Sequence, residues 1–186
     1  MKKILVWDLP TRIGHWLLVT AFVLAFISGD SEAWRLVHVA AGYAMGGVLL
    51  FRIFWGIAGT RYARFTSFLF SPRQVMAYLG GLLKGKTSHW VGHNPAGSYA
   101  IYALMFLGFA TVISGWAVYE ELGGDILEEL HEFLSYSMLT MVGLHVAGVI
   151  FSSKLHHENL VRSMIDGYKQ GTATEGIASV KRPWTI

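Results

Sequence analysis

Long apolar stretches alternate with short polar connections along this chain of 186 residues. Four stretches, 13–27, 37–57, 97–118 and 126–152, come close to the roughly 17–25 mostly apolar residues that a helix needs to cross a bilayer. The stretch 97–118 contains no charged residue, so as a helix it would have no polar face for water. The pattern therefore predicts four transmembrane helices.

Two shorter segments outside these stretches predict amphipathic helices. Ser71 and Pro72 are typical of an N-cap and a first helical residue, and apolar residues recur at helical spacing over 75–83. The same spacing recurs over 160–168. We expect both helices to lie on the membrane surface, with their charged sides in water.

The predicted fold class is thus all-α: an integral membrane four-helix transmembrane bundle with interfacial amphipathic helices. It occupies residues 1–170, and we expect the polar residues 171–186 to form a mobile tail. Asp125, with Glu128 three residues later, predicts the N-cap of the fourth transmembrane helix.

Composition agrees with a membrane protein and excludes several classes of function. Hydrophobic residues make up 53% of the chain and charged residues 15%, against about 25% charged residues in soluble domains. The chain has no cysteine, which excludes disulfide frameworks, thiolate metal sites, thiol catalysis and covalent haem attachment through C-x-x-C-H. A cleaved signal peptide is the alternative for the first stretch, but Asp8, Pro10 and Arg12 interrupt its leader.

The few charges predict how the helices are oriented. Basic residues gather before the first stretch, between the second and third, and after the fourth, whereas the two other connections contain Arg35 as their one basic residue. Because basic loops remain in the cytoplasm, we expect both chain termini inside. The predicted topology then explains why basic residues outnumber acidic ones, with a net charge of +3, and no feature of the sequence supports nucleic-acid binding. The acidic residues expected outside are Asp30, Glu32, Glu120, Glu121, Asp125, Glu128, Glu129 and Glu132.

Four of the eight histidines lie in or at the edges of the apolar stretches, where ionisable groups are costly and usually functional. They are His15, His38, His131 and His145. A helix would place His131 and His145 on nearly one face, about 21 Å apart along its axis. In the predicted orientation, His15 and His145 form an inner pair, and His38 and His131 form an outer pair.

Two neutral imidazoles facing each other inside a bundle suit the two axial positions of a haem iron. Zinc would prefer four converging ligands, and each depth offers two. A proton relay would more often include buried Asp or Glu, and the apolar parts of these stretches contain none, because Glu128, Glu129 and Glu132 are expected at the outer end of the fourth stretch. Isolated structural histidines are the remaining alternative.

Further residues fit a haem at these depths. Gly42 follows His38 by one turn and would let a porphyrin approach the helix backbone. Arg52 lies on the same predicted face at the inner depth, where it could pair with a haem propionate, as could Arg12 and Arg35 near the two surfaces. The alternative for these arginines is snorkelling towards lipid headgroups.

His93 and Asn94 lead into the third stretch at the inner depth. Together with Arg52 they form a candidate quinone site, because such a pair could bond a quinone carbonyl. The alternative is that they cap the helix and solvate propionates.

The chain resembles the bacterial four-helix dihaem b-type cytochromes, which include cytochrome b561 and the cytochrome b subunits of nickel–iron hydrogenases. The resemblance covers residues 7–165 and rests on Arg12-Ile13-Gly14-His15-Trp16, on His38-Val39-Ala40-Ala41-Gly42-Tyr43 and on the pair His131 and His145. The stretches 51–56 and 63–65 and the run Gly-His-Asn-Pro-Ala-Gly are similar to a branch associated with periplasmic c-type cytochromes. The resemblance implies two haem b groups with His15, His38, His131 and His145 as axial ligands.

The expected function is transmembrane electron transfer in the bacterial inner membrane, between ubiquinone or menaquinone and a periplasmic redox partner such as a c-type cytochrome. One alternative is a superoxide:quinone oxidoreductase that acts without a partner, although an acidic outer face would repel an anionic substrate. Another is the cytochrome b anchor subunit of a hydrogenase or dehydrogenase. A small transporter or proton channel is the non-redox alternative, and a homodimer stays open.

Overall fold

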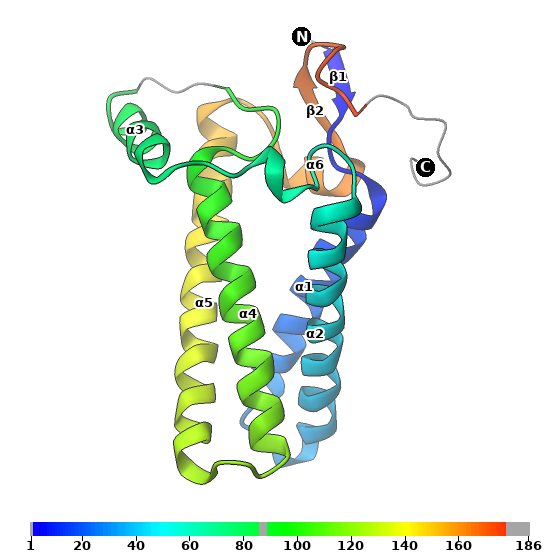
Figure 1. Ribbon diagram of the computed structural model, residues 1–186, viewed down its shortest axis with the longest axis vertical. Helices are drawn as coiled ribbons and strands as arrows, with labels where there is room; N and C mark the ends of the chain where they lie inside the picture. Colours follow the sequence, from blue (N-terminus) through cyan, green and yellow to red (C-terminus); the bar gives the residue numbers. More distant parts are fainter. Residues whose placement is uncertain (1, 86–88, 178–186) are drawn as a thin grey trace. The chain divides into compact units, whose positions relative to one another are not determined.

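The computed structural model describes residues 2–85 and 89–177 of the chain (Figure 1). Its long helices are α1 (Leu9–Ser28), α2 (Arg35–Ala58), α4 (Pro95–Tyr119) and α5 (Gly124–Leu155). By length and composition all four could cross a membrane. Their apolar side chains are widely exposed, with Leu36 79% and Phe106 71% accessible, as expected where lipid replaces water. The predicted all-α membrane bundle is confirmed, and the chain is a multi-pass membrane protein.

Short elements connect the long helices. Two 3-10 turns, η1 (Glu32–Trp34) and η2 (Phe65–Ser67), follow α1 and α2. Helices are present at both predicted positions, as α3 (Pro72–Leu83) and α6 (Leu160–Asp166). The second is shorter than predicted, because Gly167 ends it in a left-handed conformation and Tyr168, expected in the helix, begins the strand β2.

The start signal of α3 is confirmed as a capping box. The Ser71 hydroxyl accepts a bond from the Gln74 amide, and the Gln74 side chain accepts one from the Ser71 amide. The start of α5 differs from the prediction. This helix begins at Gly124, so Asp125 lies in its first turn, where a carboxylate still interacts favourably with the helix dipole.

A two-stranded sheet was not predicted. Strand β1 (Lys2–Leu5) pairs antiparallel with β2 (Tyr168–Gly171), with Lys2 opposite Gly171 (Figure 1). Residues 171–177, expected to begin a mobile tail, are bonded back to the preceding structure. The amide of Ile177 donates to the Leu5 carbonyl, and the Tyr62 hydroxyl donates to the Glu175 carbonyl. The rest of the predicted tail, 178–186, lies outside the described residues.

The chain divides into two compact units. Unit 1 comprises residues 1–12, 54–101 and 145–186, and unit 2 comprises residues 13–53 and 102–144. Each transmembrane helix therefore contributes one end to unit 1 and the remainder to unit 2.

The core of unit 1 is built on the first residues of the chain. Ile4, Val6, Trp7 and Tyr62 are buried together, with Met164 packed against them. Beside them Asp8 is 2% exposed, and its carboxylate accepts bonds from the Thr11 amide, the Trp55 indole and the Thr60 hydroxyl. One buried carboxylate thus caps α1 and ties its start to the end of α2.

The core of unit 2 is a close packing of helices. Ala21, Met45 and Leu49 are buried together, with partly buried side chains of α1 and α4 packed against them. A Cβ at Gly46 would come within 3.0 Å of Val112, and one at Gly108 within 3.0 Å of Leu49. Small residues at these contacts let α2 and α4 approach closely, as is typical of helices in membranes.

Candidate functional site

The outer histidine pair comes together in unit 2. His38 of α2 and His131 of α5 have ring centroids 6.0 Å apart, with their planes at 89°. Both side chains are half-buried. Because a metal–imidazole bond is about 2 Å long, this separation is close to that of two imidazoles sharing one metal ion. The structure therefore brings together two histidines that the sequence analysis expected at the same depth.

Each ring of the outer pair is oriented by a backbone carbonyl. The Nδ1 of His38 bonds the Ala25 carbonyl of α1 at 2.8 Å, and the Nδ1 of His131 bonds the Thr111 carbonyl of α4 at 3.1 Å. A carbonyl can only accept, so each Nδ1 carries the proton and each Nε2 keeps its lone pair for a metal. All four helix segments of unit 2 contribute to this arrangement, which is typical of ligating histidines.

Two further residues of α4 meet the ring of His131. The Ser114 hydroxyl lies 3.0 Å from its Nδ1. Gly115 lies against the ring so closely that a Cβ there would fall 2.7 Å from the ring carbon Cε1. Sequence reasoning missed Thr111, Ser114 and Gly115, although small and polar residues inside an otherwise apolar span are a detectable signal.

The residues around the outer pair fit a haem. Gly42 lies one turn after His38, and no side chain comes within 4 Å of the position that its Cβ would take. A planar group could therefore approach the backbone of α2 at this point. Among the residues that the structure describes, no group of three or more His, Asp or Glu side chains converges to hold a metal ion.

The inner histidines belong to different units. His15, in α1, lies in unit 2, and its ring makes an edge contact with Trp16 at 5.3 Å. His145 lies in the part of α5 that belongs to unit 1. The pairing of His15 with His145 stays a prediction.

The three candidate arginines have different surroundings. Arg12 donates to the Ile165 carbonyl at 2.5 Å, which ties the start of α1 to α6 within unit 1. Arg35 is exposed, and its guanidinium lies 5.9 Å from the ring centre of Tyr119. Arg52 is half-buried in α2. Their roles towards propionates stay predictions.

His93 and Asn94 lie in unit 1, whereas Arg52 lies in unit 2. The His93 ring packs between Trp7, at 4.6 Å, and Phe68, at 4.5 Å. The Asn94 side-chain oxygen accepts a hydrogen bond from the Gly97 amide at 2.7 Å. The backbone carbonyl of Asn94 accepts one from the Ser98 amide. Asn94 therefore caps α4, as one of the two sequence-based alternatives held.

A second polar cluster in unit 1 was not predicted. Lys169 is 5% exposed and pairs with Glu158 at 3.3 Å, while it also donates to the Trp90 carbonyl. Burial lowers the pKa of Lys169, and the Glu158 carboxylate partly offsets this. The Nε2 of His89 lies 3.6 Å from Glu158, and the His89 ring makes an edge contact with His156.

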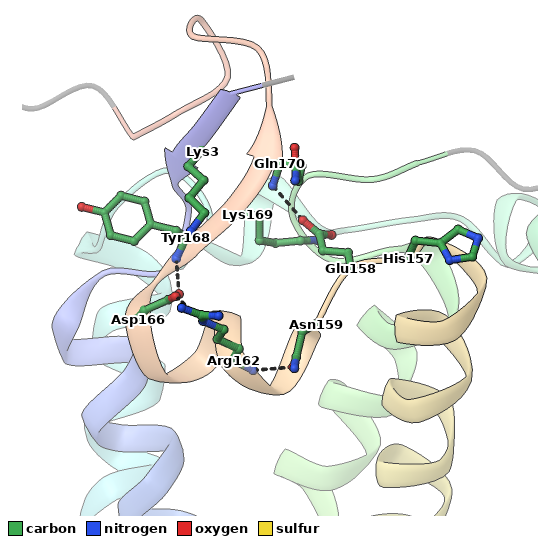
Figure 2. Close-up of a pocket in the computed structure, with 9 residues that line it drawn as sticks. All are labelled: Lys3, His157, Glu158, Asn159, Arg162, Asp166, Tyr168, Lys169 and Gln170. Carbon is green, nitrogen blue, oxygen red and sulfur yellow. Dashed lines mark hydrogen bonds and ion pairs between the residues drawn. The ribbon is translucent and has the colours of Figure 1, made fainter.

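A surface pocket adjoins this cluster (Figure 2). Four of its charged groups are paired within the wall: Arg162 with Asp166 at 3.3 Å, and Lys169 with Glu158. The Glu158 carboxylate also accepts from the Gln170 amide. The interactions of Glu158 join β2 to the segment that follows α5 and so help to hold unit 1 together, whereas the pair of Arg162 and Asp166 lies within α6. The lining residues are Lys3, His157, Glu158, Asn159, Arg162, Asp166, Tyr168, Lys169 and Gln170.

The family described as "Prokaryotic cytochrome b561" matches residues 6–167. The chain belongs to this family. This cytochrome is similar to the probable Ni/Fe-hydrogenase B-type cytochrome subunit of Rhodobacter capsulatus, with 23% identity over 90% of this chain and 81% of that protein. It is also 23% identical to the probable Ni/Fe-hydrogenase 1 B-type cytochrome subunit of Escherichia coli K12, over 88% of this chain and 89% of that protein.

A third relative is the probable Ni/Fe-hydrogenase B-type cytochrome subunit of Cupriavidus necator, 23% identical over 91% of this chain and 88% of that protein. Family membership and these relatives establish a b-type cytochrome, which contains haem b and transfers electrons across the membrane. The expected function is confirmed at this level.

Proposed function

We propose that this cytochrome carries electrons between the membrane quinone pool and a redox partner on the outer side of the bacterial inner membrane. Two haem b groups, held by His15 with His145 and by His38 with His131, would form the path. The observation that carries the proposal is the outer pair: two half-buried imidazoles with centroids 6.0 Å apart, each bonded through Nδ1 to a backbone carbonyl.

The residues around the outer pair define what a haem there could do. A haem iron accepts and releases one electron at a time. If His38 and His131 both held the iron, they would leave no position open to oxygen, which would favour electron transfer over oxygen chemistry. The carbonyl bonds from Ala25 and Thr111 hold both rings in one tautomer, so little rearrangement accompanies a change of charge.

Quinone exchange is proposed at the inner depth, beside His93 and Asn94. Both residues lie in unit 1, directly before α4 begins at Pro95. Unit 1 also contains the start of α1. The His93 ring is held between two aromatic rings, which fixes its position for a hydrogen bond to a quinone carbonyl. A quinone site at the outer depth is the competing possibility.

The outer face is proposed to receive a redox protein. Glu120, Glu121, Asp125, Glu128 and Glu129 are exposed at and after the connection between α4 and α5. Clustered negative charge attracts a partner with a basic surface and speeds the encounter. A c-type cytochrome with such a surface fits this description. The relatives are named as hydrogenase subunits, which supports a hydrogenase or another dehydrogenase as the second candidate.

Haem content of single histidine variants tests the proposed ligands. We expect the wild-type protein to hold about two haems per chain, and each of His15→Ala, His38→Ala, His131→Ala and His145→Ala to hold about one, because loss of an axial ligand frees its haem. Haem and protein are measured on the same purified sample by pyridine haemochrome absorption and amino-acid analysis. His157→Asn is the control, since His157 is exposed and asparagine tolerates its left-handed backbone.

Double variants test the pairing. The combination of His38→Ala with His131→Ala should retain one haem, whereas His15→Ala with His38→Ala should retain none. One haem remaining in the second combination would overturn the pairing by depth. A colourless wild-type preparation would overturn the dihaem proposal.

The partner is tested by purification from detergent-solubilised membranes. Co-purification of a c-type cytochrome supports the leading proposal, and that of a hydrogenase or dehydrogenase supports the second candidate. The superoxide alternative predicts haem reduction by superoxide within milliseconds to seconds in stopped flow. Absence of that reduction removes it.

A further inference from the structure

The two rings of the outer pair are held unequally. Within the described residues, the Nδ1 of His38 has one acceptor, the Ala25 carbonyl at 2.8 Å. The Nδ1 of His131 has two oxygen neighbours, the Thr111 carbonyl at 3.1 Å and the Ser114 hydroxyl at 3.0 Å. Ser114 is 5% exposed, so water does not compete for this contact.

The Ser114 hydroxyl is itself held in place. It donates to the Thr111 carbonyl at 3.0 Å within α4. A hydroxyl has a single proton, and this one is engaged with Thr111. The oxygen therefore offers a lone pair to the Nδ1–H of His131, so Ser114 accepts rather than donates. Thr111, Ser114 and His131 form a closed triangle of hydrogen bonds.

Gly115 leaves room for the His131 ring to reach this triangle of hydrogen bonds. A Cβ at this position would lie 2.7 Å from Cε1 of His131, closer than real Cβ atoms approach, and 3.1 Å from its Nδ1. Glycine thus allows the edge of the His131 ring to sit directly on α4, where it reaches the oxygens of Thr111 and Ser114.

We propose that Ser114 is a positioning residue that lowers the reduction potential of the haem held by the outer pair. The inference rests on the proposed ligand role of His131. A second acceptor on Nδ1–H moves electron density onto the imidazole and makes its Nε2 a stronger donor. A stronger axial donor favours oxidised over reduced iron, so the Ser114 contact shifts this haem to a lower potential. His131 is then a stronger donor than it would be with Thr111 alone.

Redox titration of Ser114→Ala tests the proposal. In the wild-type background we expect one haem potential to rise and the other to stay unchanged. The expected change is about threefold to tenfold in the equilibrium constant of one-electron reduction, which corresponds to about 30–60 mV. The titration is repeated in the His15→Ala background, where the outer haem should remain alone, so that the shifted potential is assigned.

Matched variants separate this effect from a general change in α4 or α5. Ser114→Thr keeps the hydroxyl and should leave the potential near the wild-type value. Ser137→Ala is the control, because Ser137 makes a similar bond to a helix carbonyl, that of Phe133. If Ser114→Ala fails to retain haem, the titration is made on Ser114→Cys instead. A thiol is a weak acceptor, so this variant should also raise the reduction potential of the haem.

The outcomes distinguish this inference from the proposed function. Full haem content with unchanged potentials in Ser114→Ala, or in Ser114→Cys where alanine loses the haem, overturns the role of Ser114 and leaves the ligands intact. An equal rise in Ser137→Ala would also overturn it. Retention of every haem in His131→Ala would instead overturn the proposed function itself.

Discussion

At the residue scale, the charged side chains buried in unit 1 are matched to specific partners on other segments. Asp8 accepts three hydrogen bonds, from Thr11, Trp55 and Thr60. Lys169 meets Glu158 and the Trp90 carbonyl. Burying a charge is costly unless it is paired and hydrogen-bonded, and each of these groups meets that condition. These residues therefore hold unit 1 together.

His156 predicts a pH dependence of stability. Burial lowers the pKa of His156 below its ordinary value of 6.5, electrostatic interactions with His89 and Lys169 lower it further, and Glu158 opposes them. The unfolded chain then binds a proton more readily than the folded one, so stability should fall as the pH drops below about 6.5. The thermal unfolding midpoint of the detergent-solubilised protein is measured from about pH 8 to about pH 5.

The variant His156→Gln isolates this contribution. Its unfolding midpoint should fall less steeply over the same pH range, because glutamine does not titrate. His157→Asn serves as the control, since His157 is exposed and should leave the slope unchanged. Equal slopes for the wild-type protein and His156→Gln would contradict the prediction.

At the element scale, α4 is the support against which α5 positions its histidine. Thr111, Ser114 and Gly115 lie within one turn of α4 and contact the ring of His131. The cap of α3 is a contrasting case. Ser71 and Pro72 are adjacent in sequence, so the local pattern alone predicted the start of this helix, and Gln74, which completes the cap, is three residues from Ser71. The helix-to-helix contact, in contrast, joins residues that no local pattern relates.

Gly115→Ala is predicted to displace the His131 ring. The added Cβ would lie 2.7 Å from Cε1, so the ring must move away from the Thr111 carbonyl. We expect the haem content to fall by about one haem per chain, measured by pyridine haemochrome absorption. Gly47→Ala is the matched control, because nothing lies within 4 Å of that position, and it should retain all haem. Full haem content in Gly115→Ala would show that the ring tolerates the displacement.

At the scale of the whole molecule, the distribution of charge predicts the orientation of the four spans. The connection between α2 and α4 is basic, whereas the connection between α4 and α5 is acidic. Basic loops stay in the cytoplasm, so Thr66 should lie inside and Leu122 outside. Both side chains are exposed and uncharged, which makes them suitable for labelling.

Single cysteines test this orientation, because the chain has none of its own. Leu122→Cys should react with a membrane-impermeant maleimide in spheroplasts of intact inner membrane. Thr66→Cys should react only after the membrane is permeabilised. The reverse pattern would invert the topology and move the proposed partner surface to the cytoplasm. The wild-type protein, without cysteine, provides the background signal.

The sequence by itself determined the local and periodic properties of this cytochrome. Bilayer thickness and the helical repeat act on consecutive residues, so apolar runs predicted four spans, and the positions of His38 and His131 within those spans predicted that they share one depth. Only the tertiary structure decided which groups meet across segments: Asp8 with Trp55, β1 with β2, and Ser114 with His131. Helical periodicity specifies the face on which a residue lies, but the partner on that face depends on how distant segments pack.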